Sequence, residues 1–225
     1  MQRKMYMSSI LISGCGITFS GQRPTWTKVL KLCGVSISDC SGPAISNYLI
    51  LNSLLDAVYS GEKYSHVICQ LTSMKKLDVE LHNKNIFLKE QDSIRNFEHL
   101  GYWPSSSSRD HEYKCIWEDY LYSPSLEQQD VLHKLLLLQT KCEQTQTPLL
   151  ILPGYKIEWT HPLHQNINFA DYIVYEEYKK DDTWNPEDHS EKNNVPIKTY
   201  QIKLAHWINQ NFLHMHLPKL DKFNV

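Results

Sequence analysis

The sequence lacks the features that mark membrane, secreted and nucleic-acid-binding proteins. No apolar stretch approaches the roughly 20 residues that a membrane-spanning helix needs. Residues 1–7 are polar and basic, and the apolar run after them is too short for a secretory signal. Basic and acidic residues number 23 and 25 and are scattered, so no basic patch for nucleic acid forms. We therefore expect a cytoplasmic protein that binds neither nucleic acid nor a membrane.

Spacings typical of metal sites and of redox-active cysteine pairs are also missing. The six cysteines show no C-x-x-C spacing, and several fall among apolar residues, where a free thiol packs as a small hydrophobe. The pairs His161 with His164 and His214 with His216 have no further ligand motif beside them, whereas zinc takes three or four ligands. The pattern predicts reduced thiols, ordinary loop histidines, and neither a metal nor another cofactor.

The sequence does contain a regular alternation of short apolar runs with amphipathic segments. A chain of 225 residues is long enough for one α/β domain with a substantial core. Ser125 and Gln128 form a capping-box pattern ahead of the longest predicted helix, and Gly34 is placed as a C-terminal glycine. Predicted strands cover residues 8–13, 35–40, 66–71 and 149–152, and predicted helices cover residues 24–33, 45–59, 125–144 and 197–212. This alternation predicts a flavodoxin-like three-layer α/β/α sandwich with a mostly parallel sheet.

Two irregular segments interrupt the alternation within what we interpret as a single domain, residues 1–225. Residues 75–124 are polar, rich in aromatic side chains and broken by Gly101 and Pro104. We predict a large insertion after the third strand, with short helices, that packs beside the domain as a lid. Its aromatic side chains would stack on a sugar or a partner, or form a satellite core. Residues 155–196 form the second irregular segment and carry His189.

Small and polar residues follow each predicted strand, at the end where α/β proteins bind their ligands. The first strand runs into Gly14-Cys15-Gly16, the second into Ser41-Gly42, and the third into Gln70-Leu71-Thr72. Ligands of doubly wound sheets sit outside the carboxyl ends of the strands. These turns, with Asp188-His189 ahead of the last helix, are therefore the candidate site. An acidic residue beside a histidine is also ordinary at the start of a helix.

The sequence resembles the SGNH (GDSL-like) hydrolases in the turn after its first strand and in the residues ahead of its last helix. In that family a Gly-Asp-Ser or Gly-Cys-Ser turn carries the nucleophile, a glycine follows the second strand, an Asn-containing turn follows the third, and an Asp/His pair precedes the final helix. The stretches Ser-Gly-Pro-Ala-Ile-Ser-Asn and Gln-Leu-Thr-Ser are also similar to uncharacterised SGNH-like proteins of marine bacteriophages. A phage origin would place the chain in the host cytoplasm.

Carried onto this sequence, the resemblance implies a hydrolase or acyltransferase whose partner is a small-molecule ester or an acylated carbohydrate; it leaves the oligomeric state open. His189 would be the general base and Asp188 its orienting partner. The oxyanion and substrate-binding positions would be Gly16, Gly42, Asn47 and Thr72. Of these, Gly42 would donate its backbone N–H to the oxyanion.

The sequence departs from the family pattern at the nucleophile and in two of the blocks. Gly16 stands where the family has its serine, and Gln70-Leu71-Thr72-Ser73 replaces the third-block Gly-x-Asn-Asp. The usual Asp-x-x-His reads Pro186-Glu187-Asp188-His189. Another nucleophile would then have to serve, and the candidates are Cys15, Ser20 and Ser41. The alternatives are that Cys15 fills a tight turn and that Ser20 caps a loop.

Glycine at position 16 leaves further interpretations open. Without a side chain there, backbone N–H groups can approach an anion closely, so the site would bind rather than cleave, or His189 would activate water directly. Gly16 would otherwise only permit a positive φ. The alternatives to an active enzyme are a catalytically silent SGNH-like ligand-binding protein and a phage-associated interaction module that uses its aromatic insertion.

Overall fold

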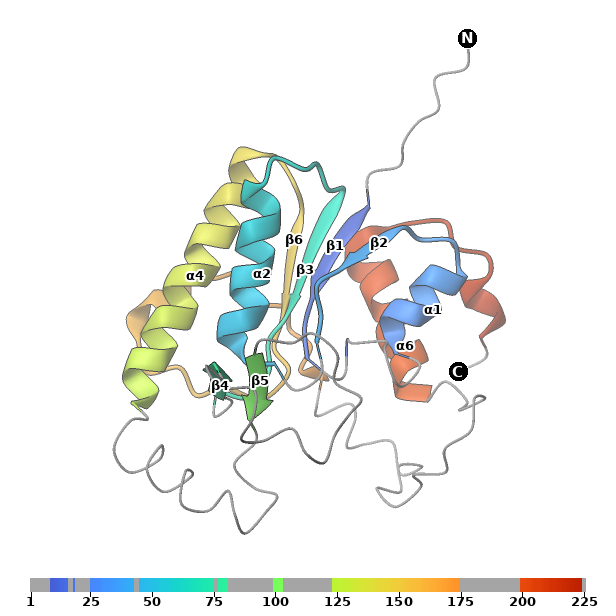
Figure 1. Ribbon diagram of the computed structural model, residues 1–225. Coiled ribbons are helices and arrows are strands. Elements are labelled where there is room, and N and C mark those ends of the chain that lie inside the picture. The colour runs from blue at the N-terminus through green and yellow to red at the C-terminus, as the bar shows by residue number, and fades with distance from the viewer. Residues whose placement is uncertain are drawn as a thin grey trace.

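Four parallel strands form the central sheet, in the order β2-β1-β3-β6 (Figure 1). The computed structural model describes residues 9–15, 18, 25–42, 45–74, 77–80, 99–102, 123–174 and 199–223. The strands of this sheet are β1 (Ile10–Ser13), β2 (Ile37–Asp39), β3 (His66–Gln70) and β6 (Leu149–Leu152). Each neighbouring pair is parallel. The four predicted strands thus form the predicted sheet.

Helices cover both faces of the sheet, which confirms the predicted three-layer arrangement. The helices are α1 (Trp26–Leu32), α2 (Asn47–Tyr59), α4 (Pro124–Gln144) and α6 (Thr199–Ile208). Helices α2 and α4 pack against each other on one face, and α1 and α6 pack against each other on the opposite face (Figure 1). A π-helical turn, Asn209–Leu213, continues α6 close to the predicted end of the last helix.

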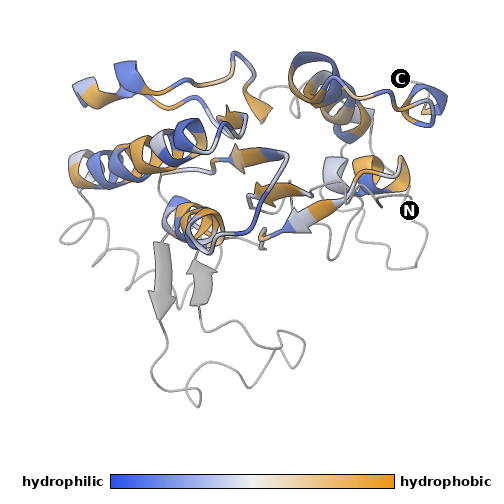
Figure 2. Ribbon diagram, turned by 90° about the horizontal axis from the view of Figure 1, so that it is seen from above, coloured by the Kyte–Doolittle hydropathy of each residue, from blue (hydrophilic) through white to orange (hydrophobic). Residues whose placement is uncertain are grey.

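Successive residues of one strand pack in different cores, and this explains why β6, residues 10–12 of β1 and the middle of β3 consist of consecutive apolar residues. In β1, Leu11 packs in the cluster beneath α2 and α4, whereas Ile10 and Ile12 pack in the cluster beneath α1 and α6. In β3, Val67 and Cys69 belong to the first cluster. A strand with only one covered face would alternate apolar with polar residues. Figure 2 shows the apolar strands lying between the two helical layers.

The start of α4 differs from the prediction. The helix begins at Pro124 with Ser123 as its N-cap, so the pattern that begins at Ser125 is not the cap. Proline suits the first helical position because its missing N–H would have no partner there. Gln128 does not close a capping box but accepts hydrogen bonds from the backbone and side chain of Thr160. It thereby ties α4 to the chain that follows β6.

The described part of the predicted insertion contains strands where we expected short helices. β4 (Leu77–Glu80) and β5 (His99–Tyr102) form a separate antiparallel pair. Leu77-Asp78-Val79-Glu80 alternates apolar with charged residues, which is the period of a strand. The second irregular segment contains a 3-10 helix, Pro162–Asn166, and one parallel bridge from Phe169 to Ile151 of β6.

Candidate functional site

The strand order creates a topological switch point between β1 and β3. From β1 the chain passes through α1 to β2 on one side, and it then returns through α2, on the opposite face, to β3 on the other side of β1. Connections that leave in opposite directions open a crevice outside the carboxyl ends of the strands. We call the residues there, 14, 15, 18, 40–42 and 70–74, the carboxyl edge. Of the predicted site residues that the structure describes, it contains Cys15, Ser41, Gly42 and Thr72.

Gln70, the last residue of β3, is at the centre of a buried network on the carboxyl edge. Its side-chain oxygen accepts a hydrogen bond from the hydroxyl of Thr18 at 2.7 Å, and the thiol of Cys15 lies 3.8 Å from the same oxygen. Its amide nitrogen donates to the carbonyl of Leu71. Gln70 and Thr18 are fully buried, and Cys15 is 5% exposed. The network holds the turn after β1 against the end of β3.

Two glycines leave the space that this amide occupies. A Cβ atom at Gly14 would lie 2.6 Å from the Thr18 hydroxyl and 2.9 Å from the Gln70 side-chain oxygen. A Cβ atom at Gly154, two residues after β6, would lie 2.1 Å from the carbonyl oxygen of Leu71. Such approaches lie well inside van der Waals contact, and a close-packed interior cannot give way cheaply. Both positions therefore require glycine for room.

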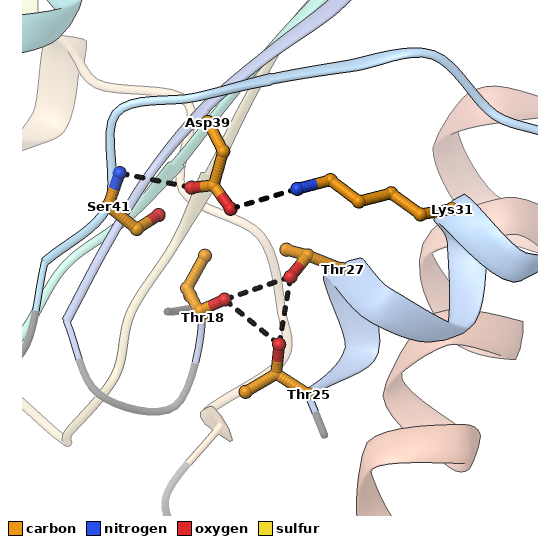
Figure 3. Close-up of polar contacts among 6 residues, drawn as sticks. All are labelled: Thr18, Thr25, Thr27, Lys31, Asp39 and Ser41. Atoms are coloured by element: carbon orange, nitrogen blue, oxygen red, sulfur yellow. Dashed lines mark hydrogen bonds and ion pairs between the residues drawn. The ribbon is translucent and has the colours of Figure 1, made fainter. Parts of the chain in front are cut away.

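The backbone of Thr18 is tied to the start of α1 as well. The hydroxyls of Thr25 and Thr27 both lie 3.0 Å from the Thr18 carbonyl oxygen as donors, and they are 2.8 Å from each other (Figure 3). The N–H of Thr18 donates to the carbonyl of Cys15 at 2.7 Å. Thr18 is consequently held through its side chain, its N–H and its carbonyl. Thr18 therefore links the end of β3 to the start of α1.

Two of the predicted oxyanion donors are engaged inside the fold. The N–H of Gly42 donates to the carbonyl of Gly14 at 3.1 Å, which joins the ends of β1 and β2. The side chain of Asn47 accepts from the N–H of Thr72 at 2.8 Å and donates to the Thr72 carbonyl at 3.2 Å. Asn47 is buried and caps the end of β3 from the first turn of α2. In this arrangement both groups serve the scaffold.

Among the described residues, two buried hydroxyls on the carboxyl edge have no hydrogen-bond partner. They are Oγ1 of Thr72, which follows β3, and Oγ of Ser41, which follows β2. An unpartnered buried polar group costs about 1–3 kcal/mol, so it is more often found where function needs it. The N–H of Ser41 donates to Asp39, whose other oxygen pairs with Lys31 at 3.4 Å (Figure 3). The Ser41 hydroxyl itself takes no part in these contacts.

Two ionisable groups near this end of the sheet are shifted toward their neutral forms. Burial raises the pKa of the Cys40 thiol, and the carboxylates of Asp39 and Glu62 raise it further. Burial raises the pKa of Glu127, in the first turn of α4, to about 8, and Asp130 adds to the shift. One oxygen of Glu127 is buried and has no partner in the part of the chain that the structure describes. Cys40 is therefore a poor nucleophile near neutral pH, and Glu127 can carry a proton there.

Several predicted site residues lie outside the described residues. They are His189, Asp188, Ser20 and Gly16, and their roles stay predictions. The same holds for most aromatic residues of the predicted insertion. Of the described candidates, the structure brings Cys15, Gly42 and Thr72 to the carboxyl edge and places Asn47 against it. The thiol of Cys15 points toward Gln70 and is buried rather than exposed to solvent.

Sequence reasoning placed Gln70 after the third strand but did not identify it as the centre of the network, and it missed Glu127. A polar residue that directly follows the apolar run Val67-Ile68-Cys69 and precedes Leu71 was the available indication for Gln70. Its partners are more than 50 residues away in the chain, at Thr18 and Cys15. Such contacts leave no local pattern. Glu127 lies in the first turn of a helix, where an acidic residue is common and does not indicate a site.

The first predicted histidine pair, His161 and His164, makes local hydrogen bonds in the described structure. His161 accepts at Nδ1 from the N–H of Leu163 at 3.3 Å, and His164 donates from Nδ1 to the carbonyl of His161 at 2.8 Å. In the described ranges, no three His, Cys, Asp or Glu side chains gather as a metal site, and the five cysteines there are free thiols. None of the described helices has the length and apolar character to cross a membrane.

Comparison with solved structures gives a distant likeness of fold, whereas comparison of the sequence gives no match. No family model and no curated protein sequence matches this chain. Among solved structures, it is similar to a protein from Desulfitobacterium hafniense DCB-2 described as a lipolytic protein of the G-D-S-L family. The TM-score is 0.44 and the identity 10%, over 90% of this chain and 98% of that chain. A likeness of this strength does not extend to function.

Proposed function

We propose that this protein is an SGNH-like hydrolase or acyltransferase that acts at the carboxyl edge on an ester, of which an acylated carbohydrate is one class. The observation that carries the proposal is the β1/β3 switch point, where a tightly held turn meets two unpartnered buried hydroxyls, those of Ser41 and Thr72. A pocket that must polarise and orient an acyl group needs fixed backbone and spare hydrogen-bonding groups together.

The proposed chemistry assigns the remaining roles by the resemblance to the SGNH hydrolases. His189, oriented by Asp188, would remove the proton from a hydroxyl or from water, and the oxygen would attack the ester carbonyl carbon. The tetrahedral oxyanion would then collapse as the alcohol leaves with the proton from His189. Because the Gly42 N–H and the Asn47 amide are engaged in the fold, we assign an oxyanion contact to the Thr72 hydroxyl.

A catalytically silent ligand-binding protein is the second candidate, and a specific observation favours it. The thiol of Cys15, which sits on the turn that carries the family's nucleophile, is nearly buried and directed at Gln70. The two family-like donors, Gly42 and Asn47, already have partners. A site built this way would hold an ester or a sugar without cleaving it.

The deciding experiment measures acid release from p-nitrophenyl acetate and from acetylated monosaccharides, with the wild type and two variants. We expect His189→Ala to lower kcat/KM by about 100-fold or more, because a general base is removed. His161→Ala is the matched control, since His161 caps the 3-10 helix at Pro162–Asn166, and its rate should equal that of the wild type. Turnover that survives His189→Ala would refute the proposed mechanism. Binding of the same sugars without turnover would support the second candidate.

A further inference from the structure

The side chain of Gln70 touches the ends of three of the four parallel strands. This side chain extends from the last position of β3 and contacts Cys15 and Thr18, which follow β1. Its amide nitrogen also lies close to Gly154, which follows β6, since a Cβ atom at Gly154 would be 2.8 Å from that nitrogen. Gly14 leaves the matching space on the other side. A fully buried amide at the meeting point of three strand ends sets where those ends lie relative to one another.

We propose that Gln70 is a positioning residue of the site: through Thr18 and Cys15 it fixes the turn after β1 at the switch point, and it holds the Cys15 thiol as a hydrogen-bond donor rather than a nucleophile. The inference rests on the proposed function, because that function gives the turn its role. We assign no bond-making step to the amide itself. Its effect passes through the residues that it holds.

The two contacts of the Gln70 oxygen differ in strength. The hydroxyl of Thr18, at 2.7 Å, makes the stronger bond and sets the direction of the amide. The thiol of Cys15, at 3.8 Å, is a weak donor to the same oxygen. Cys15 is only 5% exposed, so little of its thiol is open to an electrophile while it stays against this oxygen. Cys15 should therefore react slowly with electrophiles while Gln70 is present.

Residue-resolved alkylation of the intact protein with iodoacetamide tests this directly. In Gln70→Leu we expect the rate at Cys15 to rise about tenfold, the change that loss of one buried hydrogen bond produces. Cys69 and Cys142, both buried in the core beneath α2 and α4, report global opening and should keep their wild-type rates. Gln139→Leu is the matched control, because Gln139 ties α4 to residues 166 and 168 far from the turn. It should leave Cys15 unchanged.

Thr18→Val keeps the fold intact more readily, because valine has nearly the shape of threonine and the backbone bonds of Thr18 remain. We expect Cys15 to react about threefold faster in this variant, since the amide loses the bond that directs it. If Cys15, Cys69 and Cys142 all react faster in Gln70→Leu, that variant has unfolded, and the rate at Cys15 in Thr18→Val then tests the proposal. A wild-type rate at Cys15 in folded Thr18→Val would overturn the proposal, as would a Cys15 that is labelled in the wild type as fast as a free thiol.

The catalytic readout separates positioning from plain structural support. For an ester that the wild type turns over, Gln70→Leu should lower kcat about tenfold and leave KM unchanged, because the turn aligns reacting groups rather than binding the substrate. Equal loss in kcat and gain in KM would count against positioning. Labelling needs no substrate, so the two proposals fail separately: labelling as expected without turnover refutes the enzyme alone, and turnover with unchanged labelling refutes the role of Gln70 alone.

Discussion

The two ends of the central sheet treat buried polar side chains differently. At the carboxyl end, the side-chain amides of Gln70 and Asn47 form hydrogen bonds with residues that follow β1 and β3. At the amino end, the ring of His66 packs edge-on against Phe212 at 5.2 Å, and its Nδ1 is buried with no partner among the described residues. Burial lowers the pKa of His66, and the nearby His214 lowers it further. Side-chain hydrogen bonds stabilise the carboxyl end, whereas at the amino end the titratable ring of His66 is held by packing against Phe212.

The comparison shows where this fold can support chemistry. A ligand site needs fixed groups, and the carboxyl end has a turn that is anchored from β3 and from α1. The same end carries the hydroxyls of Ser41 and Thr72, which have no hydrogen-bond partner among the described residues. Preorganisation of this kind is what the proposed reaction requires. The amino end offers stability but no comparable constellation among the described residues.

The largest effect on stability is expected for Gly154→Ala, which places a methyl group among the strand ends at the carboxyl end of the sheet. The new methyl group would meet the backbone carbonyl of Leu71, so the strand ends must separate. We expect the free energy of unfolding to fall by about 3 kcal/mol, measured by urea denaturation. Gly61→Ala is the control, because Gly61 has φ +90° but nothing within 4 Å of the added Cβ. It should lose about 1–2 kcal/mol from backbone strain alone. Equal losses would mean that crowding at Gly154 is not the cause.

A smaller loss is expected when the Asn47 cap is removed. Asn47→Ala leaves the N–H and the carbonyl of Thr72 buried and unpaired, so the free energy of unfolding should fall by about 2 kcal/mol. Asn47→Asp keeps the acceptor and should lose less. Asn52→Ala, on the same helix, should change the value by no more than about 0.5 kcal/mol. If Asn47→Ala lowered the free energy of unfolding no more than Asn52→Ala, the hydrogen bonds of Asn47 to Thr72 would not stabilise the carboxyl end.

The smallest effect concerns pH and the amino end. The pKa of His66 lies below its ordinary 6.5 in the folded state, so the unfolded chain binds the proton more readily. Stability should therefore be full above about pH 7 and fall as the pH drops below about 6.5, by less than about 1 kcal/mol. His66→Leu should flatten this dependence relative to the wild type. His133→Ala, an exposed residue on α4, should leave it unchanged. A wild-type slope in His66→Leu would assign the effect to other groups.

Much of the fold could be predicted because its causes are local. Continuous apolar runs mark strands that are covered on both faces, and Gly34, with φ +93°, ends α1 where a C-terminal glycine was expected. The prediction was wrong at the start of α4, because Ser123 competes with Ser125 and the partner of Gln128 lies 32 residues away at Thr160. It was also wrong for β4 and β5, where expected short helices gave way to a strand pair.

The candidate site was predictable in place but not in detail. By itself, the sequence determined the parallel sheet, its two helical layers and the gathering of small and polar residues after each strand, since periodicity and turn residues act over a few positions. Only the tertiary structure decided that Gln70 meets Thr18 and Cys15, that Asn47 closes on Thr72, and that the Gly42 N–H belongs to the scaffold. These contacts join residues up to 55 positions apart, and only the packing of the strands brings them together.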